Sequence, residues 1–148
     1  MEDKVNVKKV TGKHELDQVF AIRRKVFVDE QNCPPELEWD FEDESTHFLG
    51  LVNDIPAGAA RWRMTDKGYK LERFAVLKEF RNSGLGKALV SAVLKDLPDD
   101  ANYVYLNAQL AAMGLYEKFG FEKEGPQFNE AGIQHFKMVR RKLRVDSR

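Results

Sequence analysis

The chain has 148 residues, and its 24 lysines and arginines balance 24 aspartates and glutamates, so the formal net charge is zero. Hydrophobic residues make up 43% and charged residues 32%, which suits one globular domain over residues 1–148 and excludes a disordered or collagen-like chain. A zero net charge gives no global attraction to nucleic acid or to an anionic membrane, so we expect neither as a partner.

The N-terminal third predicts a strand, a helix and a loop. Apolar and polar residues alternate over residues 5–10, which indicates a short strand. Over residues 15–29 the spacing of Leu16, Val19, Phe20, Arg23 and Phe27 is that of one face of an amphipathic helix. Residues 31–46 contain two consecutive prolines and a run of acids, which favours a loop.

A strand meander is expected next. Residues 48–52 and 57–64 predict two strands that flank the turn residues of 53–56. A second turn over 65–68 leads into a third strand over 69–76. Consecutive strands joined by short turns indicate antiparallel neighbours in one sheet.

The C-terminal half predicts helices that alternate with strands. Leu85, Leu89 and Val93 belong to one apolar stripe of a helix over 85–97, which Pro98 ends. A strand over 103–106, a helix over 111–119 closed by Gly120, and a final strand pair from residue 121 with 133–139 follow. This order implies an α/β (α+β) fold with a mixed sheet covered by helices.

Neither export nor membrane insertion is indicated. The N-terminal residues lack the basic-then-apolar order of a signal peptide, and no stretch reaches the ~18 apolar residues that a membrane span requires. Cys33 is the single cysteine, so it forms no internal disulfide, and without a Cys/His cluster it indicates no metal site. We therefore expect a cytoplasmic protein.

The densest chemical signal is the glycine loop, residues 81–87 (RNSGLGK), between a predicted strand and a predicted helix. Glycines there allow a sharp turn that directs backbone N–H groups at the helix N-terminus toward an anion such as a phosphate. A Walker loop is disfavoured because Ala88 stands where serine or threonine binds magnesium, and the dinucleotide fingerprint fails at Leu89. An ordinary glycine-containing turn is the alternative.

A longer pattern surrounds this loop. Residues 71–76 (LERFAV) precede RxxGxGKAL, and AxxLYEKFGF follows over 112–121. Together these motifs resemble the GNAT acyltransferase family, whose acyl-CoA pyrophosphate motif is R/Q-x-x-G-x-G/A. The flanking segments 23–31 and 132–138 look like its small bacterial branch, usually called ElaA-like. The resemblance covers nearly the full chain, with Gln109 where many family members carry asparagine.

The resemblance implies a single GNAT-type domain with a mixed, mostly antiparallel sheet, splayed strands, and helices on both faces. In such a fold the pantetheine arm of acyl-CoA lies between the splayed strands, and the pyrophosphate lies against the glycine loop. Either amide, glutamine or asparagine, can hydrogen-bond pantetheine. The cofactor-binding residues so implied are Phe74, Ala75, Val76, Arg81, Asn82, Ser83, Gly84, Leu85, Gly86, Lys87 and Gln109.

Tyr116 matches the position of the family's usual general acid, which protonates the departing thiolate. A phenol with an ordinary pKa near 10 is protonated at neutral pH and is able to donate to sulfur. The alternative is a core tyrosine at helical spacing with Leu115 and Phe119.

Several residues are candidates for the base that accepts the amine proton. Glu72 lies on the cofactor strand, where strict alternation puts it on one face with Phe74 and Val76. Glu30 follows the first helix, and His135 belongs to the Gly-Ile-x-His match. His47 precedes a strand in a similar match and has no better support than His135. An exposed strand residue, a solvated helix end and a structural histidine are the respective alternatives.

Other features have ordinary explanations beside the functional ones. The acidic stretch 36–44 could attract a cationic amine or be a solvated loop. Arg61 and Arg63 share a strand face, where they could bind an acidic group or pair with carboxylates. The basic tail 140–144 could touch RNA or serve solubility, and Cys33 is a passive residue.

With this resemblance, we predict an acyl-CoA-dependent N-acyltransferase that uses acetyl-CoA and no metal. Its catalytic residues would be Tyr116 with Glu72 or His135, and its acceptor a small-molecule or peptide amine. The alternative is a non-catalytic acyl-CoA-binding or regulatory module, which keeps the glycine loop but lacks a productive amine site. A nucleic-acid-associated protein is a third function class, with only the basic tail in its favour. Whether the chain forms a homodimer is a question that the sequence leaves open.

Overall fold

Strands β2 (Thr46–Val52), β3 (Ile55–Met64) and β4 (Tyr69–Val76) form an antiparallel meander in the computed structural model, which describes residues 3–32 and 44–141. The turn between β2 and β3 contains Asn53 and Asp54 with φ of 51° and 67°. Two such residues suit a tight hairpin, because Asn and Asp tolerate the left-handed region. The predicted meander is confirmed.

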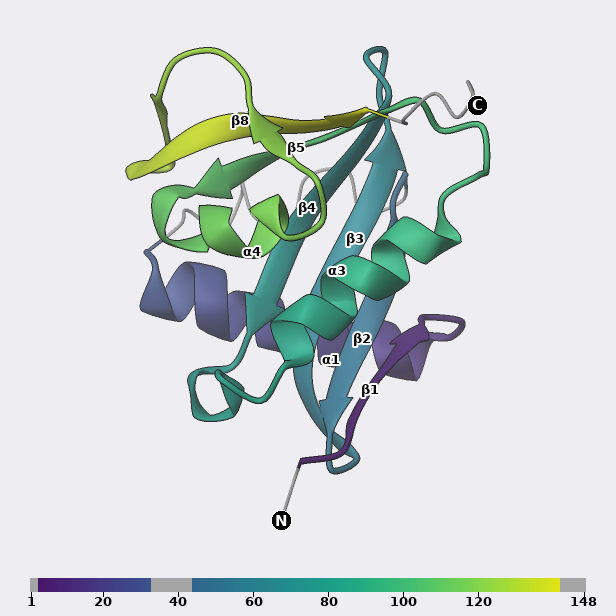
Figure 1. Cartoon of the computed structure of the whole chain (residues 1–148). Coiled ribbons are helices and arrows are strands. Elements are labelled where there is room, and N and C mark those ends of the chain that lie inside the picture. The colour runs from purple at the N-terminus through teal and green to yellow at the C-terminus, as the bar shows by residue number, and fades with distance from the viewer. Residues whose placement is uncertain (1–2, 33–43, 142–148) are drawn as a thin grey trace.

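The remaining strands extend this sheet on both sides. β1 (Val5–Lys9) pairs with β2, and β5 (Tyr103–Gln109) lies parallel to β4. β8 (Ile133–Arg141) pairs with β5, and the short β6 (Glu122–Lys123) and β7 (Phe128–Glu130) both pair with β8. Among the described strands only β4 and β5 are parallel neighbours, so the mixed, mostly antiparallel sheet is confirmed (Figure 1).

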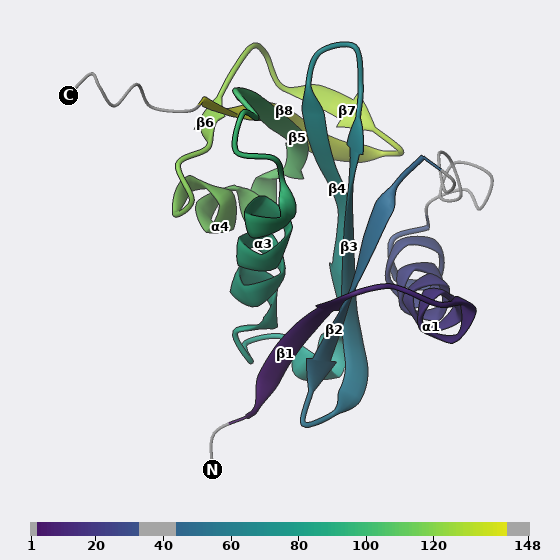
Figure 2. The same cartoon turned by 90° about the vertical axis from the view of Figure 1, so that its right-hand side faces the viewer.

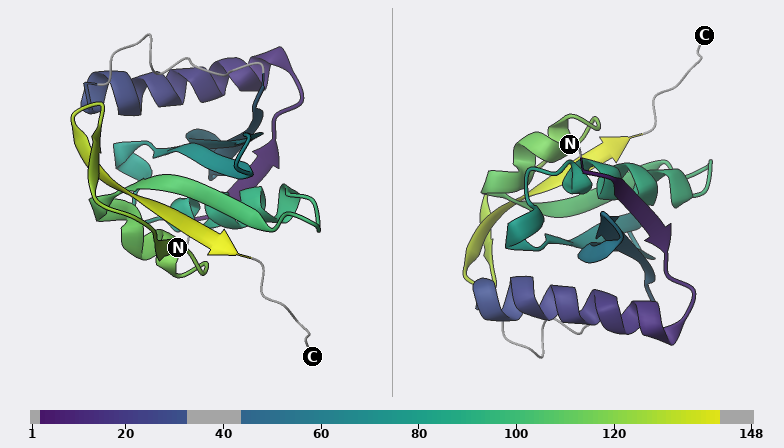
Figure 3. Two further views of the ribbon diagram at one scale, coloured as in Figure 1. Left: turned by 90° about the horizontal axis from the view of Figure 1, so that it is seen from above. Right: turned by 90° about the horizontal axis from the view of Figure 1, so that it is seen from below.

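Helices cover both faces of the sheet, as Figures 2 and 3 show. On one face lies α1 (Lys13–Arg23), which continues into the π-helical segment η1 (Arg24–Glu30). On the other lie α3 (Leu85–Asp96) and α4 (Met113–Glu117), with the short 3-10 turns η2 (Lys78–Phe80) and η3 (Leu110–Ala112) before them. None of the helices within the described ranges is long and apolar enough to cross a bilayer.

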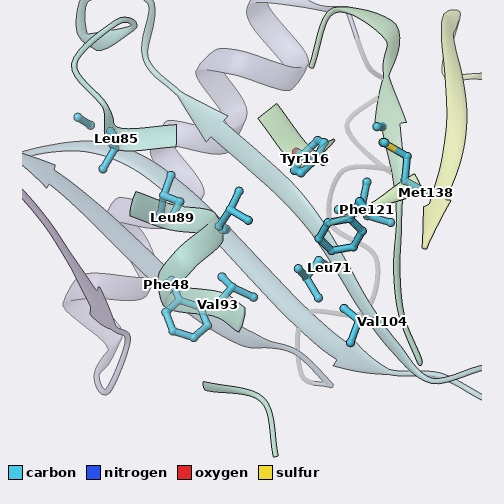
Figure 4. Close-up of a cluster of buried hydrophobic side chains, with 14 of the residues drawn as sticks. Phe48, Leu71, Leu85, Leu89, Val93, Val104, Tyr116, Phe121 and Met138 are labelled. Atoms are coloured by element: carbon cyan, nitrogen blue, oxygen red, sulfur yellow. The ribbon is translucent and has the colours of Figure 1, made fainter. Parts of the chain in front are cut away.

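Each face of the sheet has its own core. Between sheet and α3, the apolar stripe of the helix packs on strand residues, and the side chains labelled in Figure 4 belong to this core. Between sheet and α1, a smaller cluster contains Val19 and Ile22 of the helix with Leu49, Ala59 and Ala75 of the strands. Burial of apolar side chains on both faces fixes the positions of the strands and therefore of their ends.

A bulge in β4 changes which residues face which core. Arg73 has φ of 60°, and the register against β3 shifts there. Such a bulge reverses the alternation for the residues after it. Glu72 therefore lies on the α1 face with its partner Arg61, whereas Phe74 and Val76 pack on the α3-side core. The expectation that Glu72 shares a face with Phe74 and Val76 is wrong, because strict alternation does not anticipate the bulge.

Some predictions concern positions outside the described residues. These are Cys33, the acidic stretch from Glu36 to Asp43 with most of the expected loop, and the basic tail beyond Arg141.

Candidate active site

The two parallel strands diverge soon after they meet. β4 and β5 pair only at Tyr69 with Val104 and at Lys70 with Tyr105. Beyond these pairs β4 stays with β3 while β5 stays with β8, so a V-shaped opening separates their C-terminal ends (Figure 1). The expected splay is therefore confirmed.

The edge of β4 that faces this opening carries backbone polar groups. The N–H of Leu77 donates to the carbonyl of Ala57 on β3 over 2.8 Å. Because successive residues of a strand direct these groups to opposite sides, Phe74 and Val76 direct theirs toward the opening. An extended ligand can pair with such an edge as an added strand does.

A cleft of about 240 Å³ lies along the opening. Its apolar lining includes Leu71 and Leu106, and its polar lining includes Asn107 and Glu130. The predicted site residues that it brings together are Glu72, Phe74, Gln109, Tyr116 and His135.

The glycine loop lies at the wide end of the opening, where β4 leads into α3. Gly84 is the residue before α3 and has φ of 91°, a conformation that favours glycine. Leu85 is buried in the core, so only its backbone is available to a ligand. A Cβ on Gly86 would lie 3.6 Å from Leu115, an ordinary contact, whereas Lys87 is exposed. The accessible loop therefore leads into the N-terminus of α3, a helix of twelve residues. The N–H groups and the dipole at this N-terminus favour the binding of an anion.

Arg81 at the start of this loop has a carboxylate partner. Its two terminal nitrogens donate to Glu30 over 2.8 and 2.9 Å, and its Nε donates to the carbonyl of Val76 over 2.9 Å. The hydrogen bonds from Arg81 lower the pKa of Glu30, which makes Glu30 a poor base at neutral pH.

Glu72 is held by three cations. Its Oε2 accepts from Arg61 Nε over 2.8 Å and from Arg63 Nε over 2.7 Å, and its Oε1 lies 3.4 Å from Lys70 Nζ. Burial favours the neutral acid and raises the pKa, but the charge of Arg61, the hydrogen bond from Arg63 and the charge of Lys70 outweigh it and lower the pKa to about 2. Such a carboxylate stays ionised and is a poor proton acceptor. Of the two interpretations of Arg61 and Arg63, the structure supports pairing with a carboxylate.

Tyr116 on α4 is buried and lines the cleft. Figure 4 shows its side chain among those of the core cluster. Its ring packs edge-on against Phe74 at 5.7 Å and against Phe121 at 6.1 Å between ring centres. Burial raises the pKa of the phenol well above its ordinary value of 10. The hydroxyl therefore keeps its proton at neutral pH and is able to donate a hydrogen bond.

His135 on β8 has a defined tautomer. Its Nδ1 lies 2.7 Å from the carbonyl of Ile133, and because a carbonyl only accepts, Nδ1 carries the proton. Nε2 of the neutral ring is then a proton acceptor in a side chain that lines the cleft. The ring stacks on Phe128 at 5.7 Å. His47, by contrast, does not line this cleft and packs edge-on against Phe20 of α1.

Sequence reasoning missed part of the cleft lining. Gln31 lies within the ElaA-like match, so that motif contained a signal for it. Asn107 and Glu130 carried no signal, because the pairing of β8 with β5 and β7 brings them together. The Asn107 amide donates to Glu130 over 3.4 Å.

Comparisons with known proteins agree with this geometry. Residues 8–142 match the family model described as acetyltransferase (GNAT) domain. The chain is 42% identical over 142 residues to the uncharacterized N-acetyltransferase YjcF of Bacillus subtilis. This alignment covers 90% of this chain and 99% of the relative. The crystal structure of Escherichia coli ElaA has a TM-score of 0.78 with 27% identity, over 93% of this chain and 99% of that one. An acyl-CoA N-acyltransferase from Pseudomonas aeruginosa has a TM-score of 0.79 with 25% identity, over 94% and 99%.

Proposed function

The chain belongs to the GNAT acetyltransferase family and is an acyl-CoA-dependent N-acyltransferase, and on that premise we propose that it transfers an acetyl group from acetyl-CoA to a primary amine. The observation that carries the proposal is the V-shaped opening between β4 and β5, which ends at the glycine loop. It joins an open strand edge to a helix N-terminus in the order that an extended arm followed by a pyrophosphate requires.

The proposed cofactor contacts follow this path. The backbone groups of Phe74 and the N–H of Val76, whose carbonyl accepts from Arg81 Nε, would pair with the amides of the pantetheine arm, and the Gln109 side chain would bind the arm from the β5 side. Ala75 faces β3, where it pairs with Ala59, so its part is to space the two contacts. The loop backbone and the charge of Lys87 would hold the pyrophosphate, with contributions from Arg81, Asn82, Ser83, Gly84, Leu85 and Gly86.

The proposed chemistry is direct attack of a neutral amine on the thioester. The amine nitrogen forms a bond to the acyl carbon, the carbon–sulfur bond breaks, the amine loses a proton and the thiolate gains one. We assign the proton acceptor to Nε2 of His135 and the hydrogen-bond donor to sulfur to Tyr116, since both side chains line the cleft. Glu72 is assigned to anchoring Arg61 and Arg63 rather than to proton transfer.

The acceptor class we propose is a small-molecule or peptide amine, supported by the polar side chains Gln31, Asn107 and Glu130 in the cleft. A non-catalytic acyl-CoA-binding module is less well supported, because a donor and an acceptor of protons both reach the cleft. The single cysteine supports a cytoplasmic setting.

The test combines binding with turnover. Acetyl-CoA at about 100 times its Kd should stabilise the folded chain by about 2.7 kcal/mol and raise its melting temperature. Release of free thiol with a panel of amines measures turnover. Gly86→Val should abolish both effects. The variant should stay folded, because a Cβ at residue 86 would make only an ordinary van der Waals contact. Gly12→Val, at a position with no atom within 4 Å of a Cβ, is the control. No melting shift in the parent protein would refute the proposal.

A further inference from the structure

The end of η1 contacts both sides of the V-shaped opening. Glu30 is the last residue of η1 and binds Arg81, which follows β4. The next residue, Gln31, accepts a hydrogen bond of 3.0 Å from the amide of Gln109, the last residue of β5. Two consecutive residues of one helix end therefore connect the two strands at the place where these lie unpaired with one another.

The Glu30 contact reaches the strand edge through Arg81. With both terminal nitrogens on Glu30, the guanidinium has a fixed orientation in which Nε donates to Val76. Val76 is the last residue of β4 and one of the two whose backbone faces the opening. The Glu30 and Arg81 side chains are each 39% exposed, so the pair adds little to global stability and acts chiefly on local geometry.

The Gln31 contact acts on the opposite strand. The Gln109 amide nitrogen is used by Gln31, which leaves the Gln109 carbonyl oxygen as an acceptor in the cleft. An acceptor there suits the N–H of an amide ligand. Gln31 itself lines the same cleft, so its side chain orients Gln109 at the site and not from a distance.

We propose that Glu30 and Gln31 are positioning residues that form a clasp: through Arg81 and Gln109 they hold the ends of β4 and β5 in the arrangement that binds acyl-CoA. This inference rests on the proposed function, since it assumes that the V-shaped opening receives acyl-CoA. Neither residue is required to touch the reacting atoms.

The experiment is a pair of double-mutant cycles in the full chain, read as KM for acetyl-CoA and as kcat. Glu30→Ala should raise KM by about fivefold and leave kcat within about twofold, because an interaction with the bound arm is lost equally in the ground and transition states. In an Arg81→Ala background the same change should raise KM by less than about twofold, since Glu30 acts through Arg81. Gln31→Ala should behave in the same way toward Gln109→Ala.

The control variant is Glu79→Ala. Glu79 is an exposed acid that lines the same surface hollow as Glu30 but makes no contact with Arg81 among those described. It should leave KM unchanged, which separates positioning from a general change of charge. Melting temperatures without acetyl-CoA should be nearly equal for all single variants. A purely structural role would instead lower the melting temperature whenever it raised KM.

Two results would overturn the clasp. One is an unchanged KM in Glu30→Ala and Gln31→Ala, and the other is a KM effect of the same size with and without the Arg81 or Gln109 partner. Either result, obtained with an active parent protein, leaves the proposed function intact. An inactive parent without any acetyl-CoA melting shift would overturn both proposals.

Discussion

Glu72→Gln removes one negative charge from a cluster of three cations while it keeps the size of the side chain. The carboxylate is 12% exposed and is shared by Arg61, Arg63 and Lys70. Folding lowers its pKa from 4.5 to about 2. Since each tenfold change in proton affinity is worth about 1.4 kcal/mol, this carboxylate contributes about 3 kcal/mol to folding stability at pH 7. The loss of a buried ion-pair partner typically costs a similar amount, about 3–5 kcal/mol.

The pH dependence has a definite sign. A group whose pKa is lower in the folded protein contributes its full stability above its unfolded pKa, and loses it as the pH falls through the folded pKa. The stability difference between the parent and Glu72→Gln should therefore shrink from about 3 kcal/mol at pH 7 to about 1 kcal/mol at pH 3. Urea unfolding curves of both proteins across this range measure the difference directly.

The same variant tests the assignment of Glu72 to anchoring. If Glu72 only anchors the arginines, the folded variant should retain turnover within about tenfold, measured below its melting temperature, because loss of a general base typically costs ~10²–10⁴-fold. Equal stability of the two proteins at pH 7, or a difference that does not change with pH, would refute the reasoning. Lost turnover with unchanged stability would return Glu72 to the list of candidate bases.

Three further predictions concern single side chains. Tyr116→Phe should lower kcat by about 10²-fold without loss of stability, measured by saturation kinetics and thermal melting. A loss of activity that is accompanied by a loss of stability would indicate a core tyrosine only. His135→Asn retains a donor for the Ile133 carbonyl but lacks Nε2, so turnover should fall by at least about 10²-fold, and unchanged turnover would leave water as the acceptor. Ala131 has φ of 53° in the β7–β8 turn, and Ala131→Asn should stabilise the protein by about 0.5–1 kcal/mol in urea unfolding; a destabilised variant would contradict this reasoning.

Local patterns in the sequence determined most of the elements. β4 has the predicted bounds, and α3 begins at the predicted Leu85, since apolar period and turn residues act over a few positions. The predicted helix over 15–29 corresponds to α1 and η1 together. The strand expected over 103–106 extends to Gln109, because pairing with β8 continues past the apolar run. The glycine loop was recognisable for the same local reason.

Only the tertiary structure decided which side chains meet. The bulge at Arg73 depends on the register between β3 and β4, and it gives Glu72 to Arg61 and Arg63. The ion pair of Glu30 with Arg81 joins residues 51 positions apart. Sequence spacing carries no information on such a contact, because it forms only when the two cores pack their helices on opposite faces of the sheet. The opening between β4 and β5 is also decided by the tertiary structure. β4 stays paired with β3 and β5 stays paired with β8, so β4 and β5 pair with one another only near their N-terminal ends and then diverge.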